Sequence, residues 1–234
     1  MKFKEWKETY FELYLKPRIK EHTYQIYDGI YHRHIETYFG ELELKDISFN
    51  HINLFLCNLM KLKGKQSDRL KPTTINLIMT LLKQIIKEAY LEDLIDKDPT
   101  KRAKRIPEDK PKTIILRTKE QKRLVSYCLD KKDDSRYLGI ILTLYTGLRI
   151  GELLALTWDK INLRSHLIEI NTTAITLKDN DNKNHIVLTK PKTSSSIRQI
   201  PIPMALFLIL QEEKNKTTSK YVINYKDNII RTRS

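Results

Sequence analysis

Apolar side chains recur every three or four residues through the first hundred residues of the chain, which is the period of a helix with one buried face. Prolines, a glycine and a serine interrupt this pattern at positions typical of helix ends. The pattern predicts a helix that ends near Pro17, a second over residues 23–39 that stops at Gly40, a third capped by Ser48 and a fourth that begins near Pro72. Four helices of this size form a small bundle.

A charged stretch with few apolar residues follows the predicted bundle. Asp98-Pro99 ends the last helical pattern, and residues 100–112 carry Pro107, Pro111 and many charges. Because so little apolar surface cannot offset the entropy of ordering a chain, we predict a basic linker here. The predicted domains are residues 1–99, the linker 100–112 and residues 113–234.

Helical and alternating patterns are mixed in the second part of the chain. Helical spacing returns first, and alternating, β-branched segments follow it. The predicted helices are residues 118–129, 137–145, 148–156 and 203–213, and the predicted strands are residues 167–175, 185–189 and 197–202, with a brief extended piece at 221–223. We expect these strands to form one small antiparallel sheet. The fold class predicted for the whole chain is α+β and mostly helical, with a four-helix bundle preceding helices and a small antiparallel sheet.

Positive charge is concentrated in the second part of the chain. The sequence holds 43 Lys and Arg residues against 29 Asp and Glu, a net charge of +14. Residues 1–100 contribute +1 of this charge and residues 101–234 contribute +13, and the density is highest over residues 101–123. Such a field suits a polyanion, since each neutralised phosphate releases condensed counterions. A solvated, lysine-rich surface explains the same charge without any partner.

Cysteine content and the length of apolar runs exclude several kinds of site. The only cysteines, Cys57 and Cys128, stand alone, so neither a disulfide framework nor a cysteine metal site is expected. The longest apolar runs, residues 138–144 and 204–210, are far shorter than the roughly 20 residues of a membrane helix. No basic-then-apolar leader opens the chain. We therefore expect a cytoplasmic protein with no membrane partner and no bound metal.

An arginine placed just after a glycine is the strongest chemical signal in the sequence. Gly147 permits a sharp turn between two predicted helices, and Arg149 falls in the first turn of the second. Free backbone N–H groups and the positive end of a helix favour an anion there, so Arg149 is well placed to hold a phosphate. Glu152 lies three residues on and can brace the guanidinium. An ordinary surface Arg–Glu pair on an amphipathic helix is the alternative interpretation.

Three stretches of the chain resemble the tyrosine recombinases, the phage integrase family. Residues 146–156 read T-G-L-R-I-G-E-L-L-A-L, are followed by Trp158, and resemble the family's first arginine box. Residues 189–203 read T-K-P-K-T-S-S-S-I-R-Q-I-P-I-P and resemble its β-hairpin. The first hundred residues resemble its helical, SAM-like core-binding domain, which ends at Asp98-Pro99. The resemblance implies that residues 113–234 form an incomplete integrase-type catalytic domain.

The resemblance also implies roles for individual residues. Arg149 is expected to be the first catalytic arginine, which clamps the scissile phosphate as charge builds on its oxygens. Glu152 takes the acidic position that orients this arginine. Lys192 matches the hairpin lysine that acts as general acid toward the departing 5′-hydroxyl. Lys190 lies two residues away on the same side of an extended chain and is the rival candidate, and a solvated loop lysine is the alternative for either.

Contacts to DNA are predicted from exposed basic and polar positions. A basic loop over residues 61–71 leads into a helix whose first turn offers hydroxyls and backbone N–H groups to phosphates, and Asn76 is placed to read a base edge. The cationic linker can lie along a nucleic-acid backbone. The predicted DNA-binding residues are Arg69, Lys71, Thr73, Thr74, Asn76, Lys101, Arg102, Lys104, Arg105, Lys190 and Arg198.

Some groups that the family uses have no counterpart in this sequence. The family's H-x-x-R box has no match, because none of the six histidines has an arginine three residues later. Tyr221 and Tyr225 lie too early to match the family's nucleophile, and packing at a sheet edge is the simpler role for them. We therefore expect a C-terminally truncated integrase that binds DNA but does not cleave it, since no activated nucleophile is present.

Three functions are compatible with these observations. The first is a site-specific recombinase that integrates or excises a phage or mobile element through a phosphotyrosyl link, without metal or other cofactor. The second is a non-catalytic clamp on duplex DNA that occupies or blocks a recombination site. The third is a helical adaptor that does not bind nucleic acid. For the first two the partner is double-stranded DNA, on which the family acts as a homotetramer, whereas the free chain is expected to be a monomer.

Overall fold

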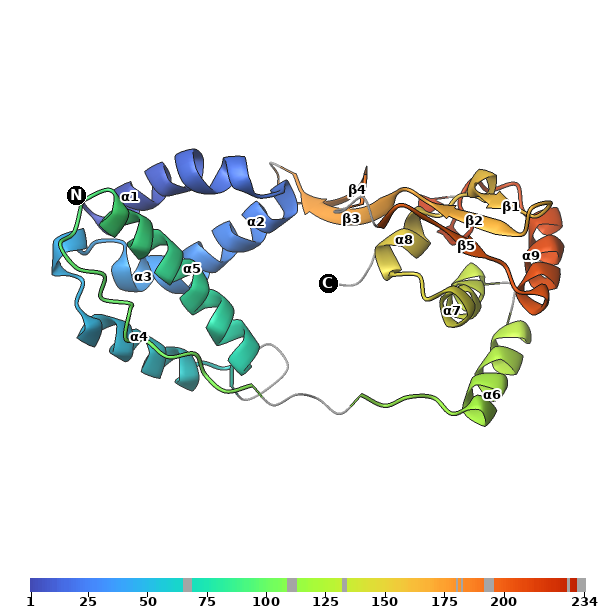
Figure 1. Cartoon of the computed structure of the whole chain (residues 1–234), viewed down its shortest axis with the longest axis horizontal. Coiled ribbons are helices and arrows are strands. Elements are labelled where there is room, and N and C mark those ends of the chain that lie inside the picture. Colours follow the sequence, from blue (N-terminus) through green and yellow to red (C-terminus); the bar gives the residue numbers. More distant parts are fainter. Residues whose placement is uncertain are drawn as a thin grey trace. The chain divides into compact units, whose positions relative to one another are not determined.

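The computed structural model describes residues 1–64, 69–108, 113–131, 134–179, 181, 183–191, 196–226 and 228–230 (Figure 1). The chain divides into two compact units, Met1–Lys112 and Thr113–Ser234. Each unit has its own cluster of buried apolar side chains. Within the described residues, no helix is both long enough and apolar enough to span a membrane.

The first unit is helical, as the sequence predicts. Its α-helices are α1 (Phe3–Thr9), α2 (Glu21–Ile30), α3 (Glu36–Phe39), α4 (Phe49–Lys61) and α5 (Pro72–Leu91). π-helical stretches at Tyr10–Leu15 and Tyr31–Ile35 continue α1 and connect α2 to α3, and short 3₁₀ turns lie at Lys16–Arg18 and Leu44–Asp46. The predicted helix ends are confirmed at Gly40, at Ser48 and at Pro72, which is in the first turn of α5.

An aromatic and aliphatic core holds the first unit together. α5 is central to it, contacting both α4 and the Tyr31–Ile35 stretch, and it buries residues at helical spacing such as Ile78, Leu82 and Ile85. Phe39 and Phe55 pack edge to face with ring centroids 5.1 Å apart. Burial of these apolar side chains is the main stabilising contribution to the bundle.

Part of the predicted linker is packed against this unit. Ala103 and Thr100 are buried, and Ile106 packs on the apolar core. The side-chain amide of Asn76 donates to the carbonyl of Ile106 at 2.9 Å and accepts from its N–H at 2.9 Å. Residues 100–106 of the predicted linker 100–112 are therefore part of the first unit, because a side chain of α5 supplies hydrogen bonds that compensate for the scarcity of apolar residues.

The second unit combines helices with small antiparallel sheets. Its helices are α6 (Thr118–Leu129), α7 (Ser135–Thr146), α8 (Ile150–Ala155) and α9 (Met204–Lys216). Its strands are β1 (Ile161–Asn162), β2 (Leu167–Ile170), β3 (Thr173–Lys178), β4 (Asn184–Thr189), β5 (Arg198–Pro201), β6 (Asn224–Tyr225) and β7 (Asn228–Ile229). The α+β, mostly helical fold class is confirmed.

The sheet arrangement differs from the single sheet that the sequence predicts. The predicted strand 167–175 is two strands: β2 pairs with β1 and β5, whereas β3 pairs only with β4 among the described strands. Between them the Asn171 side chain donates to Glu169 at 2.7 Å and accepts from the Thr172 hydroxyl at 2.9 Å. These local side-chain bonds compete with ladder pairing, so the chain leaves one sheet and enters another.

Candidate functional site

Arg149 stands at the junction of α7 and α8. Gly147 has φ +65°, a left-handed conformation that ends α7, and its N–H donates to the Thr143 carbonyl at 2.9 Å. Arg149 has an extended backbone and is the N-cap residue of α8. The prediction placed it in the first turn of the helix, whereas it lies just before that turn. Its side chain is 70% exposed. A rigid turn thus presents a guanidinium to solvent at the start of a helix.

Glu152 is a buried carboxylate on which two arginines converge. Only 4% of its side chain is exposed. Its oxygens accept from the Arg149 backbone N–H at 3.0 Å and from Arg149 Nη1 at 2.9 Å. They also accept from Arg198 Nη1 and Nη2, each at 2.9 Å. The predicted bracing of Arg149 by Glu152 is therefore present in the structure, and Arg198 joins it.

The electrostatics of this cluster follow from those four hydrogen bonds. The bonds from the Arg198 guanidinium, more than those from Arg149, lower the pKa of Glu152 to about 2, against the opposing effect of burial. The same carboxylate raises the pKa of Arg198. At neutral pH the cluster therefore holds one negative and two positive charges, and the excess positive charge is on the exposed Arg149.

The helix that Arg149 caps, α8, packs closely on the β3–β4 hairpin. A Cβ atom built on Gly151 would lie 2.5 Å from Thr173 Oγ1 and 2.8 Å from the Ala174 carbonyl oxygen, so only glycine fits. Thr173 pairs with Thr189, the residue before Lys190. α8 thus lies beside the end of the hairpin from which the predicted lysines emerge. Lys190 is exposed there, and Lys192 lies outside the described residues.

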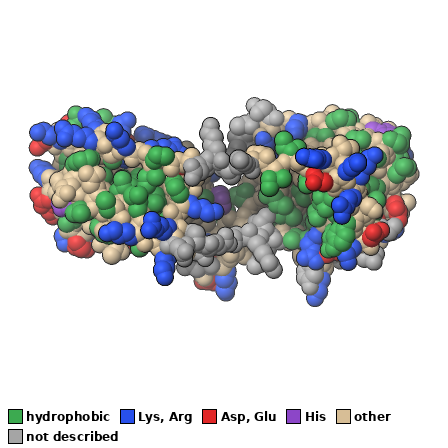
Figure 2. Space-filling model, turned by 90° about the horizontal axis from the view of Figure 1, so that it is seen from below, with side chains coloured by type: hydrophobic (Ala, Val, Ile, Leu, Met, Phe, Trp, Pro, Cys, Tyr) green, Lys and Arg blue, Asp and Glu red, His purple; other side chains and the backbone are tan. Residues whose placement is uncertain are grey.

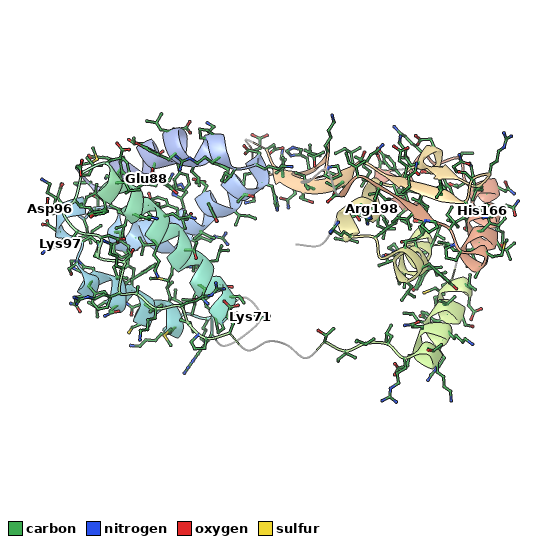
Figure 3. All side chains as sticks on the ribbon, viewed as in Figure 1. Lys71, Glu88, Asp96, Lys97, His166 and Arg198 are labelled. Atoms are coloured by element: carbon green, nitrogen blue, oxygen red, sulfur yellow. The ribbon has the colours of Figure 1, made fainter. Side chains whose placement is uncertain are left out.

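Arg198 occupies a position that sequence reasoning did not foresee. It is the first residue of β5 (Figure 3). It pairs with Ile170 of β2, and 29% of its side chain is exposed. Its partner Glu152 is 46 residues away in the sequence. No local sequence pattern links residues so far apart. The one signal in the sequence was a charged residue, Arg198, near the start of a strand whose other positions alternate.

The predicted DNA-binding residues of the first unit fall into two groups. Arg69, Lys71 and Thr73 are exposed around the start of α5, and Thr74 is half-buried. Asn76 is 6% exposed, and both ends of its amide bond Ile106. This position contradicts the predicted base contact, because an amide committed to the backbone inside the unit cannot reach a base edge.

Basic side chains of the segment after α5 remain at the surface. Lys101, Arg102, Lys104 and Arg105 are all exposed. Lys101 Nζ lies 4.8 Å from the centroid of the Tyr90 ring, and Arg105 donates to Glu108 at 2.7 Å. Figure 2 shows Lys and Arg side chains on the visible face of both units. Exposed positive charge of this kind suits phosphate contacts.

Other kinds of active site find little support in the described parts of the chain. No group of three or more His, Cys, Asp and Glu side chains there is arranged to hold a metal ion. Cys57 and Cys128 are free thiols. Tyr221 is half-buried and forms an isolated β-bridge with Thr157, in keeping with the sheet-edge role expected for it. The Tyr225 side chain lies outside the described structure.

Two family models match most of the chain. The model of the phage integrase N-terminal SAM-like domain matches residues 2–60, and the model of the phage integrase family matches residues 114–232. The second match contains the Arg149–Glu152–Arg198 cluster, and the first contains α1 to α3 and all of α4 except Lys61.

Several individual proteins are similar over most of this chain. The ICEBs1 integrase of Bacillus subtilis (strain 168) is 28% identical over 221 residues, which are 89% of this chain and 56% of that protein. A XerC-like tyrosine recombinase of Caldanaerobacter subterraneus subsp. tengcongensis is 29% identical over 84% of this chain and 51% of that protein. The chain therefore spans about half the length of these curated relatives.

Solved structures share the fold at lower identity. The Tn1549 transposon integrase in complex with transposon right end DNA superposes with a TM-score of 0.75 and 20% identity, over 97% of this chain and 72% of that one. The lambda integrase tetramer bound to a Holliday junction gives a TM-score of 0.71 and 16% identity, over 99% of this chain and 62% of that one.

Proposed function

The chain belongs to the phage integrase family, and from this premise we propose that it grips duplex DNA for site-specific recombination, as the integrase of a phage or other mobile element. Arg149 clamps the backbone phosphate at which strands are exchanged. The first unit, through residues 1–99, serves as the core-binding domain, and residues 113–234 contribute the first arginine box and the hairpin of the catalytic domain.

The exposed guanidinium of Arg149, fixed on a buried carboxylate, is the observation that carries this proposal. Glu152 is 4% exposed and Arg149 is 70% exposed, so the carboxylate that orients the arginine is buried and the guanidinium is at the surface. A guanidinium presents N–H groups in a planar fork that matches two phosphate oxygens. Preorganised donors of this kind stabilise charge that develops on a phosphoryl group without needing to reorganise.

The partner proposed for this site is double-stranded DNA. The similar Tn1549 and lambda integrases were solved with DNA, the latter as a tetramer on a Holliday junction. Exposed basic residues precede α5 at Arg69 and Lys71 and follow it over residues 101–105. We propose that these residues contact the DNA backbone and that the protein assembles as a homotetramer on its recombination site.

We further propose that this 234-residue polypeptide binds duplex DNA without cleaving it. None of its histidines is followed by arginine three residues later, so the second arginine of the clamp has no match in these residues. A non-catalytic clamp that occupies a recombination site is the alternative function that this observation favours. Incubation with a nicked duplex that carries the element's junction sequence should give no covalent adduct on a denaturing gel, and an adduct would overturn the proposal.

Binding of a duplex across a salt titration tests the role of Arg149. We expect Arg149→Ala to weaken binding roughly tenfold or more and to reduce the slope of log affinity against log salt by about 0.9, because one phosphate contact is lost. Arg164→Ala is the matched control, since Arg164 is an exposed arginine of the same unit at a turn before β2. Equal affinities for Arg149→Ala and Arg164→Ala would rule out the proposed clamp.

A further inference from the structure

Arg198 and Arg149 share one carboxylate but differ in how much of each guanidinium remains available. Both terminal nitrogens of Arg198 donate to Glu152 at 2.9 Å, and Nη1 also lies 3.3 Å from the Ser196 carbonyl. Arg149 donates to Glu152 through Nη1 alone among its side-chain nitrogens. Arg198 is 29% exposed and Arg149 is 70% exposed. Both terminal N–H groups of Arg198 are therefore already bonded to Glu152, whereas, within the described residues, Nη2 and Nε of Arg149 remain available to a ligand.

The charge on Glu152 has to be satisfied by one of these arginines. A carboxylate with 4% of its side chain exposed has almost no access to water, so it needs cationic partners. With Arg198 bound to both of its oxygens, one side-chain bond from Arg149 Nη1 and one bond from the Arg149 backbone N–H complete the set. Without Arg198, the carboxylate would draw Arg149 into a two-bond pair, and the exposed positive charge would be neutralised.

Arg198 also joins two parts of the unit that the backbone does not pair. It belongs to β5, which pairs with β2 in the three-stranded sheet. Glu152 belongs to α8, which packs on β3 of the separate β3–β4 hairpin. The segment with the candidate lysines follows β4, which ends at Thr189, and precedes β5, which begins at Arg198 in the three-stranded sheet. The ion pair therefore anchors the exit of that segment to the helix that Arg149 caps.

We infer that Arg198 is a positioning residue, and not a DNA ligand: by occupying Glu152 it keeps the Arg149 guanidinium open for a phosphate. This inference rests on the proposed function of Arg149. It replaces the direct DNA contact that the sequence suggested for Arg198, and it makes a hairpin-exit arginine part of the arginine-box site.

A double-mutant cycle on duplex binding tests the inference. We expect Arg198→Gln to weaken binding about fivefold in the native background and less than twofold in the Arg149→Ala background, because its effect passes through Arg149. The salt slope should fall by about 0.9 with Arg149→Ala and should not fall further in the double variant. Additive losses, or a further fall of about 0.9 in the double variant, would show that Arg198 contacts phosphate itself.

Two further variants separate positioning from other roles. Arg198→Lys keeps the charge but cannot form the two-bond pair, so we expect it to bind as weakly as Arg198→Gln. Recovery of native affinity in Arg198→Lys would overturn the inference. If Arg198→Gln acted by unfolding the second unit, Trp158 fluorescence would report the unfolding. Affinity would then fall equally in the native and Arg149→Ala backgrounds, and this result would also overturn the inference. Native affinity in Arg149→Ala would instead mean that the proposed function has failed.

Discussion

Lys7 in the first unit and Glu152 in the second are the buried charged side chains of the described residues, with 3% and 4% exposure. Lys7 Nζ lies over the rings of Phe11 and Tyr31, 4.3 and 4.7 Å from their centroids. Its carboxylate partners are Glu8 at 3.1 Å and Asp28 at 3.4 Å. The Lys7 ammonium is therefore enclosed by aromatic rings and carboxylates, and it is not exposed to solvent.

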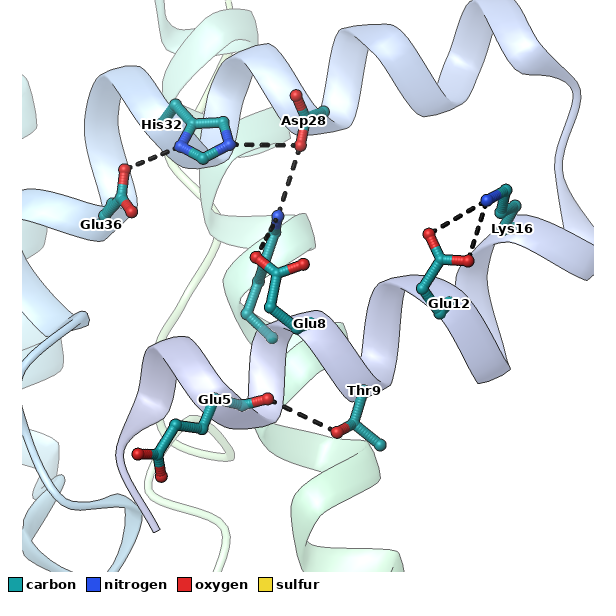
Figure 4. A network of polar contacts seen from close by, with 9 residues as sticks. Glu5, Glu8, Thr9, Glu12, Lys16, Asp28, His32 and Glu36 are labelled. Atoms are coloured by element: carbon teal, nitrogen blue, oxygen red, sulfur yellow. Dashed lines mark hydrogen bonds and ion pairs between the residues drawn. The ribbon is translucent and has the colours of Figure 1, made fainter.

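The network around Lys7 continues along the surface of α2 and beyond. Asp28 lies 3.4 Å from His32 Nε2, and His32 Nδ1 lies 2.7 Å from Glu36 (Figure 4). Carboxylates outnumber cations in this chain of contacts. Glu152 shows the reverse balance, because one carboxylate holds two arginines and one of them is 70% exposed. An exposed partner is common to both clusters, since Glu8 beside Lys7 is also 70% exposed. What distinguishes the second cluster is that its exposed partner is a cation, the charge that a phosphate requires.

The two tryptophans allow each unit to be followed separately. Trp6 is in the first unit and Trp158 in the second, so a Trp6→Phe background reports the second unit and a Trp158→Phe background reports the first. The Trp6 indole N–H donates to the Ile85 carbonyl at 2.9 Å. The Trp158 indole nitrogen is buried, and no partner for it is found among the described residues. The free energy of unfolding in urea can therefore be compared between units.

The largest expected effect is that of Glu152→Met. Removing the carboxylate leaves Arg198, which is only 29% exposed, without its partner, and we expect the second unit to lose about 3 kcal/mol of unfolding free energy. Urea unfolding in the Trp6→Phe background measures this. Asp181→Met is the control, because Asp181 is 75% exposed and pairs with Lys183 at 3.7 Å, a surface pair worth less than about 1 kcal/mol. Equal losses in the two variants would contradict a special role for the buried carboxylate.

Acid should produce the next effect. The folded pKa of Glu152, about 2, lies below its ordinary value of 4.5. The carboxylate therefore stabilises the folded unit fully above about pH 4.5, and this contribution falls as the pH drops toward 2. The shift corresponds to about 3 kcal/mol at most. Urea unfolding at pH 6 and pH 3 should show a loss for the second unit that is smaller in Glu152→Met.

Salt sharpens the same comparison between the units. Lys2 and Lys4 lower the pKa of Glu41 in the first unit to about 2 as well, but Glu41 is 69% exposed. Added salt screens exposed pairs much more than buried ones. The part of the acid effect due to Glu41 should therefore shrink in concentrated salt, and the part due to Glu152 should persist. An acid loss in the second unit that salt abolishes would contradict the buried position of Glu152.

Local sequence patterns predict the first unit better than the second. The helical spacing, Ser48 and Pro72 are all local signals, and the structure follows them. The Arg149 turn was predictable for the same reason, since Gly147 and Glu152 lie within a few residues of it. Arg198–Glu152 and Asn76–Ile106 were not, because each joins residues at least 30 positions apart. Tertiary packing decides which polar side chain meets a distant partner, and the periodicity of the sequence carries no information about it.

Asn76→Ala should have a smaller effect, confined to the first unit. It removes both hydrogen bonds to Ile106, and we expect a loss of about 1–2 kcal/mol in the Trp158→Phe background. The amide of Ile106 should also exchange its hydrogen faster. Asn53→Ala is the control, because Asn53 is exposed on α4. If Asn76 instead acted on DNA, its variant would weaken binding and leave the amide exchange unchanged.

Lys7→Met is expected to have the smallest effect, within about 1 kcal/mol of the native first unit and in either direction. Methionine fills the space between the Phe11 and Tyr31 rings and makes favourable sulfur–aromatic contacts. The carboxylates left behind, Glu8 and Asp28, are 70% and 37% exposed and so remain hydrated, unlike Arg198 in the Glu152 variant. Lys7→Ala is the control that leaves a cavity, and it should cost more than Lys7→Met. A loss above about 2 kcal/mol for Lys7→Met in urea unfolding would mean that the buried ammonium itself stabilises the first unit. Lys7 and Glu152 would then differ only in that Glu152 has an exposed cation, Arg149, as a partner.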